Sequence, residues 1–126
     1  MKQSEYLRYD AVALADLIRR GEVAASEICE AAIKRAATVN GKLNAICHPQ
    51  FSDALSQTST PDSTFSGVPM LLKDLAQEQQ GQPCTYGSRG LKKNIASRDS
   101  EFVRRARAAG LIFLGRTATP EFGLKA

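Results

Sequence analysis

The sequence of 126 residues is poor in the residue types that mark special classes of protein. It has no tryptophan, a single histidine, His48, and three widely spaced cysteines, Cys29, Cys47 and Cys84, with no Cys-x-x-Cys pair. This spacing argues against a metal centre and favours free thiols in a reducing compartment. No run approaches the about 18 to 20 apolar residues of a membrane span, and residues 1–10 lack a signal-peptide core. We therefore expect a cytoplasmic protein.

Charge and composition also exclude several classes of partner. Hydrophobic residues make up 43% and charged residues 24% of the chain, which is typical of a folded protein, and its length allows one domain. The formal net charge is +4 at pH 7. However, Arg104, Arg105 and Arg107 fall on the polar face of one expected helix, with no aromatic residues between them, which favours a solvated face. We expect neither a nucleic-acid partner nor a membrane partner.

The patterns in residues 1–55 predict a helical leader. A first helix should begin after Asp10, a good N-cap, and end at Gly21, while Ser26 can cap a second helix that ends at Asn40-Gly41. The apolar stripes of these two helices are Leu14, Leu17 and Ile18 in the first, and Cys29, Ala32, Ile33 and Ala36 in the second.

Residues 43–47 alternate weakly and predict a short strand, and Phe51, Ala54 and Leu55 indicate further helical turns. Residues 56–66 are almost all small, polar or proline, so they predict an exposed connection. This connection divides the helical leader from residues 67–126.

Residues 67–126 have the pattern of an α/β fold. Residues 67–72 form an apolar run that opens with glycine and proline, which is typical of a strand covered on both faces, and residues 111–114 predict a second buried strand. Between them, a helix should be capped by Asp99 or Ser100, end at Gly110 and bury three side chains, those of Phe102, Val103 and Ala106. This order predicts a largely parallel sheet between helices, which is incomplete because too few elements are available to flank it.

Lys73 is the residue whose setting suggests chemistry, because it directly follows the apolar strand residues 69–72. A free lysine has a pKa of about 10.4, and burial beside apolar neighbours lowers it, so that a neutral amine could accept a proton from a serine. Two simpler interpretations are a lysine solvated at a strand end and an ion pair with Asp74. Local sequence alone favours these simpler interpretations.

A longer match changes this balance. The octet Gly67-Val68-Pro69-Met70-Leu71-Leu72-Lys73-Asp74 resembles the lysine motif of amidase-signature enzymes, and Thr85-Tyr86-Gly87-Ser88 resembles the small-residue turn of that family. The segment from Asp99 to Gly123 is similar to the helix, strand and loop that follow in the family, and residues 10–45 match its opening region. The chain therefore resembles the N-terminal part of a single amidase domain over nearly its whole length.

This resemblance implies a fold with one large mixed sheet between helices, and cleavage of carboxylic amides by a serine nucleophile, a second serine in a cis peptide, and a lysine. Only the lysine maps here, onto Lys73, and both serines belong to a stretch that the family places after residue 126. The resemblance implies no cofactor and no metal. It implies a small-molecule amide as substrate, and a homodimer is the assembly we consider for the full-length parent.

Four further residues need an interpretation. Gly87 and Ser88 could line the substrate pocket on the side of the lysine or simply form a turn, and Ser88 lacks the Gly-x-Ser-x-Gly setting of a nucleophile. Asp74 could accept hydrogen bonds from local backbone or be solvated, and we assign it no proton transfer. Ala118 departs from the family, in which an asparagine is common at this position.

Two alternatives stay open. The first is the glutaminase subunit of a transfer-RNA amidotransferase, although Leu75 stands where that branch usually has asparagine. The second is a truncated, non-catalytic module that docks through exposed sheet edges.

Overall fold

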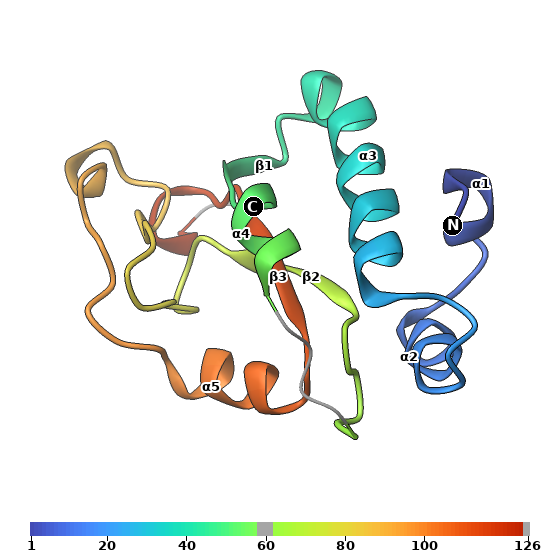
Figure 1. Ribbon diagram of the computed structural model, residues 1–126. Helices are drawn as coiled ribbons and strands as arrows, with labels where there is room; N and C mark the ends of the chain where they lie inside the picture. Colours follow the sequence, from blue (N-terminus) through green and yellow to red (C-terminus); the bar gives the residue numbers. More distant parts are fainter. Residues whose placement is uncertain (58–61, 125–126) are drawn as a thin grey trace.

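The computed structural model describes residues 1–57 and 62–124 (Figure 1). Its helices and strands are α1 (Gln3–Tyr6), α2 (Ala11–Arg19), α3 (Ala25–Leu43), β1 (Ile46–Pro49), α4 (Phe51–Ser56), β2 (Pro69–Lys73), α5 (Glu101–Ala108) and β3 (Ile112–Thr117). Two single 3-10 turns, Arg89–Leu91 and Glu121–Gly123, complete the order. Residues 58–61 of the expected connection lie outside the described residues. None of the described helices combines the length and the apolar character needed to cross a membrane.

The three strands form one mixed sheet in the order β1-β3-β2. Strand β2 runs parallel to β3, and β1 runs antiparallel to it. Figure 1 shows α3 and α5 on opposite sides of these strands. The predicted α/β fold is therefore confirmed, with a sheet that is mixed and has β1 and β2 at its edges.

The core is divided between the two faces of the sheet because successive strand residues point in opposite directions. On one face, Ile112 and Leu114 of β3 pack with Cys29 and Ala32 of α3 and with Ala54 of α4. On the other face, a second set packs together, formed by Leu72, Val103, Ala106 and Phe113. Together the two sets hold helices against both faces of β3, the central strand.

Helix α2 follows the predicted signals closely. The Asp10 side chain accepts a hydrogen bond of 2.8 Å from the backbone N–H of Ala13, and Gly21 takes a left-handed conformation with φ of 71° just after the helix. Leu14 and Leu17 are buried, as expected. The side-chain cap at Asp10 and the glycine stop at Gly21 are therefore confirmed.

We expect Asp10→Ala to destabilise the chain by about 1 kcal/mol, because the substitution removes the acceptor that satisfies an N–H group of the first turn. Thermal or urea unfolding followed by circular dichroism measures this loss. Asp10→Ser is the matched control, since it keeps an acceptor and should stay within a few tenths of a kcal/mol of the wild type. Equal losses in the two variants would contradict a capping role.

Helix α3 differs from the prediction at both ends. It begins one residue before Ser26, and the carboxylate of Glu27 accepts a 3.0 Å hydrogen bond from the N–H of Ala24 at the N-cap. At the other end, the helix continues through Gly41 to Leu43 and stops at Asn44, whose φ is 50°.

The predicted end of the helix at Asn40 was wrong, because the Asn40 side chain forms hydrogen bonds to β1 instead of ending the helix. Its Oδ1 accepts from the N–H of Ile46 at 2.8 Å, and its Nδ2 donates to the Ile46 carbonyl at 3.2 Å. Asn40 thereby fastens α3 to the first residue of β1. The strand consequently covers Ile46–Pro49 rather than residues 43–47.

Helix α5 begins after Ser100, whose hydroxyl accepts from the N–H of Val103, and the chain turns at Gly110 with φ of 87°. Val103 and Ala106 are buried as expected, but Phe102 is 44% exposed, so its inward placement was wrong. Val103 and Ala106, three residues apart, define the inner face, and Phe102 lies about 100° around the helix from Val103.

The arginines of α5 lie on its solvent face, as expected. Arg104 and Arg105 both form ion pairs with Glu101, one turn earlier. Arg107 pairs with Asp99 at 3.0 Å. All three arginine side chains are exposed, so these pairs add little to stability.

Candidate active site

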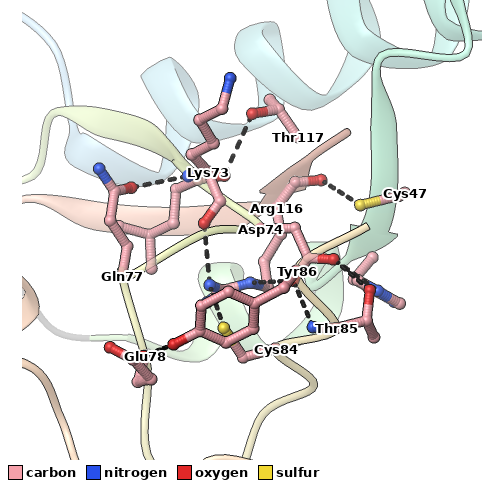
Figure 2. Close-up of polar contacts among 12 residues, drawn as sticks. Cys47, Lys73, Asp74, Gln77, Glu78, Cys84, Thr85, Tyr86, Arg116 and Thr117 are labelled. Carbon is pink, nitrogen blue, oxygen red and sulfur yellow. Dashed lines mark hydrogen bonds and ion pairs between the residues drawn. The ribbon is translucent and has the colours of Figure 1, made fainter. Parts of the chain in front are cut away.

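Lys73 is the last residue of β2 and lies opposite Thr117, the last residue of β3, at the carboxyl ends of these two parallel strands. Its backbone is held firmly: the N–H donates to Oε1 of Gln77 at 2.7 Å, and the carbonyl accepts from Nη2 of Arg116 at 2.8 Å. Its amine has no hydrogen-bond or ion-pair partner within residues 1–57 and 62–124 (Figure 2). The side chain is exposed, so the described residues do not enclose its amine in apolar surroundings.

Asp74, the next residue, is 1% exposed and does not pair with Lys73. Its Oδ1 accepts from Nε of Arg116 at 3.2 Å and from the backbone N–H of Thr85 at 2.8 Å, and its Oδ2 accepts from the Thr85 hydroxyl. The alternative interpretations of a Lys73–Asp74 ion pair and of a solvated Asp74 carboxylate are therefore both wrong, whereas Lys73 is exposed at the end of its strand. Asp74 does accept from a backbone N–H, but that of Thr85, 11 residues away, rather than from the local backbone expected.

Arg116 is the residue that sequence reasoning missed. Its side chain is fully buried, and besides Asp74 it contacts the Lys73 carbonyl and Sγ of Cys84, which lies 3.2 Å from Nη2 (Figure 2). A buried guanidinium requires a paired anion, which Asp74 supplies, while Nη1 has no hydrogen-bond partner among the described residues. The available signal was an arginine that directly follows the buried run Ile112–Gly115, where a charge demands a partner.

A β-bulge in β3 turns Arg116 toward Asp74. In the pairing with β2, Met70 lies opposite Phe113 but Leu71 lies opposite Gly115, so Leu114 is an additional residue in β3. Strict alternation would direct Phe113 and Arg116, which are three residues apart, to opposite faces of the sheet. The extra residue shifts the alternation, and Arg116 lies opposite Leu72 on the face covered by α5.

Gly115 makes this bulge possible. Its φ is 143°, and a Cβ placed on it would lie 2.5 Å from the carbonyl oxygen of His48 in β1. Any side chain would therefore push β1 away from β3.

We expect Gly115→Ala to destabilise the chain by roughly 2 to 3 kcal/mol, because it combines backbone strain with overpacking against β1. Gly41→Ala is the matched control. Gly41 lies inside α3, where a Cβ would meet no atom of another described segment within 4 Å, and the variant should be more stable by up to about 1 kcal/mol because alanine has the higher helix propensity. Urea unfolding measures the free energy of unfolding of both variants. A Gly115→Ala variant as stable as the wild type would contradict the packing argument.

Gly87 and Ser88 lie in a turn beside a cavity of about 580 Å³. The described lining residues are Cys47, His48, Asp74, Thr85, Gly87, Ser88, Arg89, Lys92, Ala118 and Thr119, and Lys73 is not among them. A Cβ on Gly87, whose φ is 65°, would lie 2.4 Å from the Thr119 carbonyl, so the turn requires glycine. The Ser88 hydroxyl donates to Glu121 at 2.6 Å. These contacts support the turn interpretation, and a substrate-binding role for the pair stays a prediction.

Cys47, His48 and Asp74 form a cluster whose possible ligand atoms all lie within 4.8 Å of one another. This donor set fits a divalent cation poorly. Both Asp74 oxygens already accept hydrogen bonds, and the cations Arg89 and Lys92 line the same cavity. Partial desolvation, followed by the nearby negative charge of Asp74, raises the pKa of the Cys47 thiol, which disfavours the thiolate that a metal ion requires.

All three cysteines are free thiols, as expected, with Cys29 and Cys84 buried and Cys47 exposed. Burial raises the pKa of the Cys29 thiol to about 11. A buried thiol of this kind behaves as a small hydrophobic side chain. Neither buried cysteine therefore has the character of a nucleophile.

Comparison with known proteins gives matches over most of the chain. Residues 27–126 match the Amidase family. A 6-aminohexanoate-cyclic-dimer hydrolase of Paenarthrobacter ureafaciens is 42% identical over 116 residues, which cover 90% of this chain and 24% of the relative. A glutamyl-tRNA(Gln) amidotransferase subunit from Renibacterium salmoninarum is 33% identical over 96% of this chain and 25% of its own length.

The fold matches solved structures as well. A structure of 6-aminohexanoate cyclic dimer hydrolase aligns with a TM-score of 0.85 and 41% sequence identity, and the alignment covers 92% of this chain and 24% of that structure. The chain thus spans about a quarter of the length of these relatives.

Proposed function

Because this chain belongs to the amidase family, we propose that it is the lysine-bearing part of an enzyme that hydrolyses carboxylic amides. The observation that carries the proposal is the family match over residues 27–126, which contains the complete Gly67–Asp74 motif. The 42% identical relative is named a hydrolase of a cyclic amide dimer, which supports cleavage of an amide C–N bond in a small molecule. The proposed reaction uses neither a cofactor nor a metal.

In the proposed mechanism, Lys73 is the general base. Its neutral amine takes a proton from a bridging serine, which takes the proton of the nucleophilic serine as that oxygen attacks the amide carbon. The C–N bond then breaks, the bridging serine returns a proton to the leaving amine, and water releases the acyl group. Both serines, the oxyanion donors and the apolar cover of Lys73 would come from sequence outside this chain.

The geometry around Lys73 is compatible with this role. Its amine is exposed at the end of β2 and is unengaged within the part of the chain that the structure describes, so it is free to meet a segment from elsewhere. Its backbone, in contrast, is fixed on both sides by hydrogen bonds to Gln77 and Arg116. A general base must lie within hydrogen-bonding distance of the serine, and a backbone held in place limits the positions that the Lys73 amine can take.

The second candidate function is the glutaminase subunit of a transfer-RNA amidotransferase. The 33% identical relative from Renibacterium salmoninarum, which is named as part of such an enzyme, favours it. Leu75 argues against it, because an asparagine is usual there in that branch. This alternative would require partner subunits, whereas the amidase proposal involves a homodimer at most. We place either enzyme in the cytoplasm.

The assay that tests the proposal compares the full-length protein containing this segment with residues 1–126 alone. We expect the full-length protein to release amine from simple amides, and the 126-residue chain to release none, because it has no serine in the required setting. Ammonia release from glutamine that depends on partner subunits would favour the second candidate. A gene that stops after codon 126 would rule out catalysis by this product and leave a non-catalytic module that docks through the edges of β1 and β2.

A further inference from the structure

We propose that Arg116 and Asp74 act as a positioning pair for Lys73: they fix the peptide group between Lys73 and Asp74, and with it the direction of the Lys73 side chain. This inference rests on the proposed role of Lys73 as general base. It adds two residues that act on the lysine through the backbone, without touching the substrate.

Both polar atoms of that peptide group are held. The Lys73 carbonyl accepts from Nη2 of Arg116 at 2.8 Å, and the N–H of Asp74 donates to the carbonyl of Thr117 at 3.0 Å. The first bond comes from a side chain and the second from the backbone of the neighbouring strand. The peptide plane at the end of β2 therefore has little freedom to rotate.

The Arg116 side chain is itself immobilised. It is fully buried, its Nε pairs with Asp74, and Asp74 is anchored in turn by the N–H and hydroxyl groups of Thr85. The planar guanidinium presents Nε and Nη2 in a rigid fork, so one side chain bonds the Asp74 carboxylate and the Lys73 carbonyl at once. A lysine at position 116 would keep the charge but could not reproduce this geometry.

The pair acts on the opposite face of the sheet from the Lys73 side chain. Lys73 lies opposite Thr117, whereas Arg116 lies opposite Leu72 on the face covered by α5. Figure 2 shows the Lys73 amine pointing away from the Arg116 guanidinium. Because the charges do not meet, the influence of Arg116 on Lys73 passes through the peptide group.

The test uses the full-length amidase and the variants Arg116→Lys, Lys73→Ala and Arg104→Lys. We expect Arg116→Lys to lower kcat by about 10- to 100-fold with KM within about twofold, because displacement of a catalytic group by about 1 Å has a cost of this size. Arg104→Lys is the matched control. Arg104 is exposed on α5 and pairs with Glu101, so its variant should keep the wild-type kcat.

Near-ultraviolet circular dichroism and the unfolding temperature establish that each variant is folded at the assay temperature. A folded Arg116→Lys variant with wild-type kcat, alongside an inactive Lys73→Ala variant, would overturn the positioning pair and leave the proposed function intact. Activity in Lys73→Ala would overturn both. If Arg116→Lys does not fold, the variant Thr85→Val provides the test. It removes the hydroxyl hydrogen bond to Asp74, and we expect it to lower kcat several-fold without raising KM. An unchanged kcat in Thr85→Val would also overturn the inference.

Discussion

Lys73→Ala in the full-length amidase is expected to lower kcat for amide hydrolysis by about 10⁴-fold or more, because members of a catalytic unit fail together when one is removed. The fold should be almost unaffected. The Lys73 side chain is exposed, and such substitutions usually change stability by about 0.5 kcal/mol or less. Initial rates on a simple amide and a thermal unfolding curve measure both effects.

Two control variants separate the base from the charge. Lys73→Arg keeps a positive charge but cannot become neutral, so we expect it to be as inactive as Lys73→Ala. Lys93→Ala removes another exposed lysine of the chain and should retain full turnover. Near-normal hydrolysis by Lys73→Ala would refute the assigned role, and activity of Lys73→Arg would show that charge, not proton transfer, is what the site needs.

Asp74→Ala is expected to have the largest effect on stability, a loss of about 3 to 5 kcal/mol in the 126-residue chain. The substitution leaves the fully buried guanidinium of Arg116 without its anion, and a single buried charge is far more costly than a pair. A typical domain has only about 5 to 15 kcal/mol in total, so this loss should remove a large fraction of the stability of the chain. Urea unfolding at 25 °C measures the loss.

The matched control is Asp16→Ala, which removes an exposed carboxylate that pairs with Arg19 and should cost less than about 1 kcal/mol. The double variant Asp74→Leu with Arg116→Met removes both charges and should recover most of the stability lost in Asp74→Ala. A double variant that loses as much as the sum of the single variants would contradict an interacting pair.

Local signals in the sequence were sufficient where a structural feature depends on near neighbours. The caps at Asp10 and Ser100 each involve residues three positions apart; Asp10 was predicted correctly, and Ser100 was one of the two candidates named for its helix, with Asp99. The start of α3 was missed because Ala24 has no side-chain acceptor, and the reciprocal bond from Glu27 takes its place. Such a cap can be recognised in the sequence only from the glutamate at position 27, three residues after the N-cap.

The candidate site was predictable only in part, because its main interactions join distant segments. Asp74 and Arg116 are 42 positions apart, and nothing beside either residue indicates the other. Their approach depends on the bulge at Leu114, which periodicity cannot reveal since a bulge is a departure from alternation. The role of Lys73 came from the family motif, and the exposure of its side chain could not be derived from that motif.

The position of β3 in the sheet has a consequence for synthesis on the ribosome. This strand lies between β1 and β2 but is translated last, so neither earlier strand has its partner until Thr117 has been added. From Ile46 to Thr117 there are 71 peptide steps (117 − 46), which take roughly 4 to 14 s at about 5 to 20 residues per second. During that interval β1, and β2 once it has been translated, are not paired with β3 on the nascent chain, and chaperones have their opportunity to bind.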